Sequence, residues 1–236
     1  MSRLFEELDY QVTDIGAVSL RRRHILSLDV DVWEVLLGDE HLMSSLFTAS
    51  EVALAERGLA ALRTAPNQGW EVVVGGLGLG YTAAAALEDD RVGALQVVEF
   101  LAPVIEWHEK GLVPLDPPLA DDPRCSVKQG DFFALAASEA GFGPTQDAIL
   151  IDIDHTPDWL LDQRSGSFYS EEGLQKLSRH LKPGGVMGLW SDAGADEAFT
   201  ARMRQVFSEA WSEPVTFHNP LQDKPFTQTV YLARKE

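Results

Sequence analysis

The 236-residue sequence contains a single cysteine, Cys125, so no disulfide can form within it. It has no apolar run near the ~20 residues that a membrane-spanning helix needs, and its first residues lack a signal peptide's apolar core. Lysine and arginine are also few, 19 against 37 acidic residues, which gives a formal net charge of −18. Nucleic-acid phosphates need clustered positive side chains, so this deficit argues against them as partners. We therefore expect a cytoplasmic protein that binds neither a membrane nor nucleic acid.

The chain is organised around a glycine-rich stretch. Residues 71–80 read Glu-Val-Val-Val-Gly-Gly-Leu-Gly-Leu-Gly, in which Gly76, Gly78 and Gly80 follow a run of β-branched residues. The valines predict a buried parallel strand, and the alanine-rich stretch from Tyr81 predicts a helix. A glycine turn between strand and helix can hold a nucleotide, because glycine allows close approach and the helix start offers free N–H groups. The spacing G-x-G-x-G is that of class I S-adenosylmethionine-dependent transferases, and a purely structural turn is the alternative.

The segments around this turn alternate between strand and helix patterns. Further strands are expected at 94–99, 125–128, 147–152, 186–190, 214–217 and 227–232, and helices at 48–63, 102–111, 170–181 and 195–211. The alternation predicts an α/β, Rossmann-like fold with a mostly parallel seven-stranded sheet and helices on both faces. The last two strands have no helix between them, which predicts a terminal antiparallel hairpin at the sheet edge. Thr48 and Glu51 are expected to form a capping box at the first helix.

The first 47 residues differ from the rest. They alternate in strand fashion, with turns at 14–16 and 38–40, and so predict a small antiparallel sheet. We expect two domains: residues 1–47 with this sheet, and residues 48–236 with the nucleoside-binding fold. The run Arg21-Arg-Arg-His24 is expected on a solvated sheet edge rather than as an anion site. Because so small a sheet is marginal alone, we expect a homodimer.

Acidic residues follow the predicted strands at the sheet edge where such folds bind nucleosides. Glu99 ends the second strand, roughly 20 residues beyond the glycines, where a carboxylate can accept hydrogen bonds from ribose hydroxyls. Asp131 follows the third strand and can accept a hydrogen bond from an adenine amino group, with Phe132 against the ring. Each residue alone is more typical of a loop, but their joint placement predicts a nucleoside site.

The strand at 147–152 ends in Asp152, followed closely by Asp154 and His155. We predict these three as the catalytic residues. Asp152 can take a proton from an amine or orient it, and His155 titrates near neutral pH, although turn residues are the alternative. Metal binding is disfavoured, because the sequence has no second histidine–carboxylate cluster at ligand spacing.

With these motifs the chain resembles the spermidine synthase (polyamine aminopropyltransferase) family. The resemblance is carried by the glycine stretch, Val-Val-Glu99, Gly-Asp131, Ile-Asp152 and Leu-Lys-Pro-Gly-Gly185, together with the small sheet before the nucleoside-binding part. It implies that Glu99 holds the ribose, that Asp131 holds the adenine, and that Asp152 takes the place of the catalytic aspartate. It also implies decarboxylated S-adenosylmethionine as donor, a small amine as acceptor, and a homodimer.

The sequence departs from this family on the side that would hold the amines. Gly78 stands where the family has an aspartate, and Ile153–Pro157 replaces Ser-Ser-Asp-Pro. Ala49-Ser50 replaces a tyrosine-containing gate, and Trp190 replaces a glutamine. Our first hypothesis is an aminopropyl transferase acting on an amine. The alternatives are a methyltransferase that uses S-adenosylmethionine on an unknown small acceptor, and a non-catalytic nucleoside-binding protein.

Overall fold

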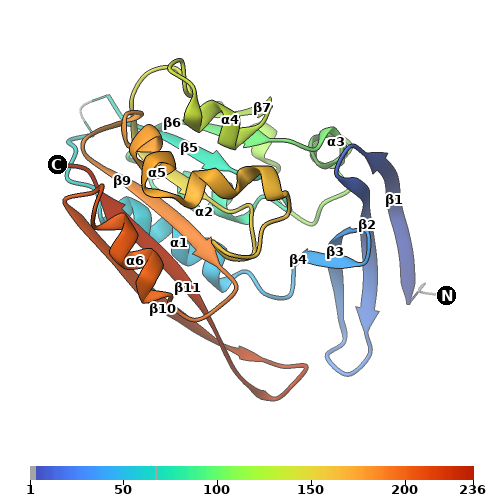
Figure 1. Cartoon of the computed structure of the whole chain (residues 1–236). Helices are drawn as coiled ribbons and strands as arrows, with labels where there is room; N and C mark the ends of the chain where they lie inside the picture. The colour runs from blue at the N-terminus through green and yellow to red at the C-terminus, as the bar shows by residue number, and fades with distance from the viewer. Residues whose placement is uncertain (1–3, 67) are drawn as a thin grey trace.

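The valine run before the glycine motif forms β5 (Trp70–Gly75), an internal strand of a seven-stranded sheet. The computed structural model describes residues 4–66 and 68–236 (Figure 1). The other strands of this sheet are β6 (Val92–Glu99), β7 (Cys125–Gln129), β8 (Gln146–Ile151), β9 (Leu181–Ser191), β10 (Glu209–Asn219) and β11 (Lys224–Arg234). Their order is β10-β11-β9-β8-β5-β6-β7. Strands β5 to β9 run parallel, and β11 is antiparallel to both of its neighbours. The predicted Rossmann-like sheet and its closing hairpin are confirmed.

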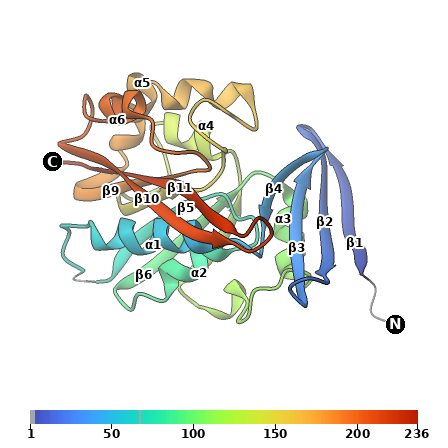
Figure 2. The same ribbon diagram turned by 90° about the horizontal axis from the view of Figure 1, so that it is seen from below.

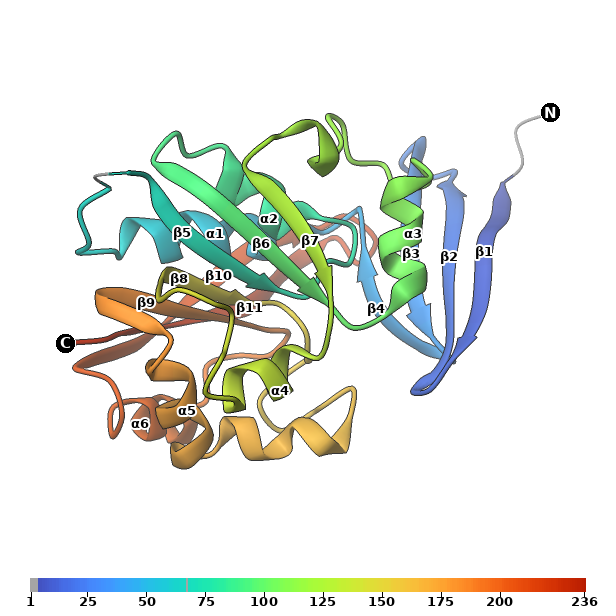
Figure 3. The ribbon, with the colours of Figure 1, turned by 90° about the horizontal axis from the view of Figure 1, so that it is seen from above.

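Helices cover both faces of this sheet, as Figures 2 and 3 show from opposite sides. One face carries α1 (Ala49–Ala60) and α2 (Tyr81–Leu87), and α3 (Ala102–Glu109) follows β6; the other face carries α4 (Phe132–Ala137), α5 (Glu171–Ser178) and α6 (Glu197–Met203). Short 3₁₀ segments occupy Leu119–Asp121 and Gln163–Tyr169. Because side chains alternate along a strand, Val72 and Val74 enter the core under α1 and α2, whereas Val73 enters the opposite one. Both cores therefore include side chains of the same internal strand, β5.

The N-terminal residues form a separate four-stranded antiparallel sheet. It comprises β1 (Phe5–Thr13), β2 (Gly16–Ile25), β3 (Val30–Leu37) and β4 (Glu40–Ser44), in chain order. This sheet lies beside α3, where Trp107 Nε1 donates to Asp9 Oδ2 at 2.7 Å and Trp33 Nε1 donates to the Leu112 carbonyl at 3.0 Å (Figure 3). The predicted small sheet is confirmed, and the division into two domains at residue 47 stays a prediction. None of the helices in the described residues is long and apolar enough to cross a membrane.

The arginine run lies on an internal strand, so its placement on a sheet edge is wrong. Strand β2 pairs with β1 on one side and with β3 on the other. The arginines are partly buried and face acidic partners: Arg21–Glu7 at 3.5 Å, Arg22–Glu6 at 2.9 Å and Arg23–Glu34 at 2.5 Å. Cross-strand pairing with glutamates therefore accounts for this charge run.

Two local predictions about helices are also wrong. The Thr48 side chain makes no capping hydrogen bond, and Glu51 is buried instead of reaching back to the helix start. Helix α6 ends at Met203 rather than near residue 211, because the chain from Glu209 pairs along the whole of β11. Tertiary pairing has overridden the local helical pattern there.

Candidate active site

A cavity of about 710 Å³ lies at the carboxyl ends of β5, β6 and β8. Its walls include His41 and Met43 from β4, Phe226 and Gln228 from β11, and the glycine turn. The order of the sheet reverses between β5 and β8, and doubly wound folds bind ligands at such a point. The volume lies in the range of small-molecule and cofactor sites. The small sheet and the closing hairpin thus complete a cavity whose floor belongs to the larger sheet.

The glycine turn bends tightly against the end of β8. Gly76 has φ +90°, and a Cβ there would overlap the carbonyl oxygen of Asp152, so only glycine fits. Gly76 and Gly78 line the cavity. Gly80, by contrast, begins α2, and a Cβ on it would meet His108 and Leu115. Of the three predicted glycines, two therefore face the cavity and the third packs under α3.

Met43 from β4 covers the turn at Gly78. Its Sδ accepts a hydrogen bond from the Leu79 N–H at 3.1 Å, and a Cβ on Gly78 would overlap this sulfur. His108 supports the same turn, with Nε2 2.9 Å from the Gly78 carbonyl oxygen. The thioether of Met43 occupies the space beside Gly78, so a longer side chain such as a carboxylate does not fit there unless Met43 moves.

Glu99 joins the glycine turn to the end of β6. Its side chain is 8% exposed, and its two carboxylate oxygens accept hydrogen bonds from the Leu77 N–H at 2.8 Å and the Leu101 N–H at 2.7 Å. Burial raises the pKa of Glu99, and the backbone donors, Leu101 first and then Leu77, act to lower it. The backbone N–H groups of Phe100 and Gly78 act in the same direction, so Glu99 is held by the turn on all sides, and its predicted contact with ribose hydroxyls stays a prediction.

Asp131 and Phe132 stand at the start of α4. The exposed Asp131 caps this helix, with Oδ1 accepting from the Ala134 N–H at 3.0 Å. Phe132 is buried, and its ring stacks on Phe142 with centroids 5.1 Å apart. Both residues line the cavity. Their contacts to an adenine ring stay a prediction, and Phe132 also serves as a core residue.

The three residues predicted as catalytic all line the cavity, but their partners differ. Asp152 is partly buried, and its Oδ2 accepts a hydrogen bond from Thr82 Oγ1 at 2.8 Å. Burial raises the pKa of Asp152 to about 6. Asp154 is buried and accepts hydrogen bonds from the Leu161 N–H and the Tyr169 hydroxyl, each at 2.7 Å. Asp152 is therefore available to a ligand, whereas Asp154 already holds the loop that follows β8.

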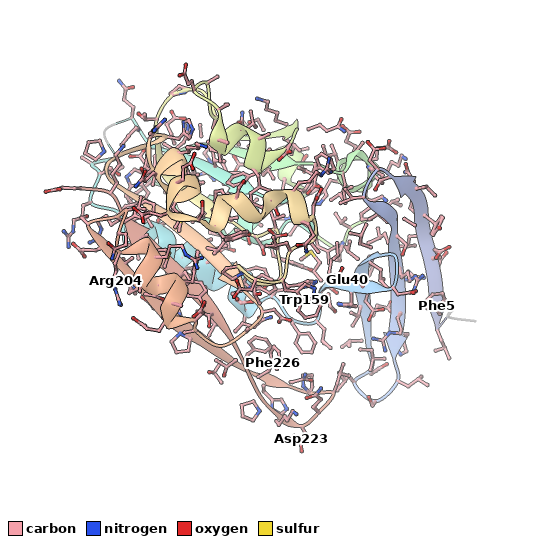
Figure 4. All side chains as sticks on the ribbon, viewed as in Figure 1. Phe5, Glu40, Trp159, Arg204, Asp223 and Phe226 are labelled. Atoms are coloured by element: carbon pink, nitrogen blue, oxygen red, sulfur yellow. The ribbon has the colours of Figure 1, made fainter. Side chains whose placement is uncertain are left out.

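His155 connects this loop to the small sheet. Its ring is buried, lies 4.8 Å from the Trp159 ring, and has Nε2 3.2 Å from Glu40 Oε1. Figure 4 labels Trp159 on the loop and Glu40 on β4, the two residues that His155 contacts. This geometry favours closing one wall of the cavity over proton transfer, and the predicted catalytic role of His155 stays untested.

Glu51 is the functional candidate that the sequence analysis missed. It is 5% exposed on α1, lines the cavity and has a pKa raised to about 8, by burial first and then by the charge of Asp152. Its Oε2 lies 2.8 Å from Ser50 Oγ, which in turn contacts Trp190 and Gln228. The sequence does hold a signal, because position 51 shares a helix face with the buried Leu54.

Metal binding has no support from side-chain grouping. Within residues 4–66 and 68–236, no three His, Cys, Asp or Glu side chains come together as a metal ion would require. The expectation of a site without metal stays a prediction.

The chain has a Rossmann-like fold of the class I methyltransferase type, with an additional N-terminal sheet. Among solved structures, spermidine synthases have a fold similar to that of this chain. One, in complex with the transition-state analogue AdoDATO, aligns with TM-score 0.74 and 19% identity over 98% of this chain and 74% of that one. Another, from Thermotoga maritima, aligns with TM-score 0.72 and 18% identity over 98% of this chain and 72% of that one. A probable spermidine synthase from Corynebacterium glutamicum aligns with TM-score 0.64 and 16% identity over 97% of this chain and 79% of that one.

The chain thus has a spermidine synthase-like fold, and the low identities make it a divergent example. The predicted resemblance is confirmed at the level of the fold. No protein-family model matches the sequence, and no curated protein matches it either.

Proposed function

We propose that this protein is a transferase that binds decarboxylated S-adenosylmethionine and moves its aminopropyl group to a small amine. The observation that carries the proposal is the pair of acidic side chains, Asp152 and Glu51, in the cavity that also contains Gly76 and Glu99. Such a pair attracts cationic amines and disfavours the carboxylate of the intact donor. A neighbour of the same fold has been solved with AdoDATO, which supports a donor of this type.

The chemistry asks little of the protein beyond alignment and proton removal. The amine nitrogen attacks the carbon beside the sulfonium, the C–S bond breaks, and its electron pair stays on sulfur in a neutral thioether. The acceptor must first lose a proton, since an ammonium nitrogen has no free lone pair. Asp152 is fixed by the Thr82 hydroxyl, and its raised pKa suits a base that works near neutral pH.

One observation favours the methyltransferase alternative. At Gly78 the turn offers a thioether from Met43 instead of a carboxylate for the donor's ammonium group. The carboxylate of intact S-adenosylmethionine would bind here only if a turn N–H exchanged its present acceptor, as the Leu79 N–H would by leaving Met43 Sδ. Product analysis with both donors distinguishes these two reactions.

The test is thioether formation with decarboxylated and intact donor, side by side, over a panel of di- and polyamines. Asp152→Asn should lower turnover by about 10²–10⁴-fold, the usual contribution of a positioned base, while calorimetric affinity for methylthioadenosine is kept. Asp158→Asn is the matched control, because Asp158 is exposed on the same loop. Equal rates for wild type and Asp152→Asn would refute the role of Asp152. Methylated products with intact donor alone would establish the methyltransferase.

The cytoplasmic location and the homodimer stay proposals, as does the absence of nucleic-acid and membrane partners. The acidic net charge of −18 supports the absence of nucleic-acid partners.

A further inference from the structure

The hydroxyl group of Ser50 is surrounded by three polar partners. Trp190 Nε1 lies 2.9 Å from Ser50 Oγ, Gln228 Oε1 lies 2.6 Å from it, and Glu51 Oε2 lies 2.8 Å from it. The indole N–H can only donate, so Ser50 accepts from Trp190. A hydroxyl carries one proton, so Ser50 can donate to Gln228 or to Glu51 but not to both.

The orientation of the Gln228 side-chain amide makes its Oε1 an acceptor for Ser50. Its Nε2 donates to Asp192 Oδ1 at 2.6 Å, which leaves Oε1 facing Ser50. The opposite orientation would place Oε1 against the Asp192 carboxylate, two acceptors in contact. While Glu51 is ionised, the single proton of Ser50 can therefore serve only one of these two contacts; both are hydrogen bonds if Ser50 donates to Gln228 and Glu51 carries a proton that it donates to Ser50.

The charges around Glu51 point the same way. Asp152 faces it from the end of β8, Asp192 from the end of β9, and the Tyr81 phenol from α2. Burial, the charge of Asp152 and the charge of Asp192 all raise the pKa of Glu51. A buried carboxylate beside a second, partly buried one is costly without a cation, so the empty site is more stable with one proton on the pair.

We propose that Glu51 is protonated in the empty cavity and gives up this proton when a substrate ammonium group enters beside Asp152. The entering cation replaces the proton as the partner of the carboxyl pair, and the proton leaves to solvent, so charge is conserved. Glu51 thereby becomes the second counter-charge of the site only when a cation is bound. This inference rests on the proposed function in one respect, namely that the cation is a substrate amine.

Infrared spectroscopy of the unliganded full chain tests the first half of the proposal. At neutral pH the carbonyl stretching band of a protonated carboxyl group should be present in the wild type and absent in Glu51→Gln. Glutamine is close in shape and its amide can still donate to Ser50, so the fold should be kept, which a thermal unfolding scan checks. Glu56→Gln is the matched control, because Glu56 is exposed on the same helix. A spectrum without a Glu51-dependent band would overturn the proposal.

Calorimetry with 1,4-diaminobutane, in the presence of methylthioadenosine, tests the second half. Measured in buffers of different ionisation enthalpy, wild-type binding should release a proton, whereas Glu51→Gln should bind more weakly and release none. Proton release that is equal in the two proteins would overturn the switch. Absence of diamine binding with the Glu51 band intact would overturn the displacement step, and the transfer assay with Asp152→Asn would still decide the proposed function separately.

Discussion

Replacing Gly78 by aspartate tests why the glycine turn lacks a carboxylate. Gly78 has φ +47°, where an L-residue costs about 1–2 kcal/mol, with aspartate near the lower end. The new Cβ would also overlap Met43 Sδ, so this side chain must move and give up its hydrogen bond from the Leu79 N–H. Overpacking of this kind costs roughly 1–3 kcal/mol. We therefore expect Gly78→Asp to lower the free energy of unfolding by about 2–4 kcal/mol.

A double-mutant cycle with Met43→Ala separates the two contributions. If the overlap is the cause, the double variant should be more stable than the sum of the single changes predicts, by about 1–2 kcal/mol. Equilibrium urea unfolding supplies all four values. Gly111→Asp is the matched control, because Gly111 has φ +65° and a Cβ there would meet nothing within 4 Å. Strict additivity, or equal losses at positions 78 and 111, would refute the steric reasoning.

Two further predictions concern the buried carboxyl groups. Glu99→Ala leaves the N–H groups of Leu77 and Leu101 without their acceptor, which should cost about 2–6 kcal/mol in urea unfolding and also weaken methylthioadenosine binding; a loss below about 0.5 kcal/mol would contradict the role of Glu99 in holding the turn. Burial raises the pKa of Asp152 to about 6 and of Glu51 to about 8, so the fold favours their protonated forms. Stability from these groups is therefore greatest at acidic pH and is lost as pH rises through these values, and Glu51→Gln should remove the upper part of this decline in unfolding measured against pH; identical profiles for the two proteins would count against it.

Much of the fold could be predicted from the sequence, because strand and helix patterns follow local periodicity. The valine run before Gly76 is buried on both faces and forms an internal strand, and the two final strands, with no helix between them, form the hairpin. The failures are places where distant partners decide the structure. Residues 204–211 read as a continuing helix, but pairing with β11 makes a strand from Glu209.

The candidate site divides in the same way. Glu99, Asp131 and Asp152 could be located because the carboxyl ends of parallel strands meet at one edge of the sheet. Position 51 could be placed on the buried face of α1, but the role of Glu51 could not be predicted, because its environment is made by residues far away in the chain, such as Gln228, 178 positions from Ser50. The spacing of Thr48 and Glu51 predicts a capping box, and only the packing of α1 against the sheet shows that this glutamate is buried.

The cavity has no carboxylate at position 78 of the glycine turn, but it has one at Glu51 on α1. Met43 fills the space beside Gly78, so the turn cannot hold a carboxylate there without rearrangement. Across the same cavity, Glu51 is buried close enough to Asp152 for the charge of Asp152 to raise its pKa. A protein that had merely lost its amine site would gain nothing from keeping a second buried carboxyl group, because burying it costs stability. The presence of this pair therefore supports the proposed cation-binding site over a purely nucleoside-binding protein.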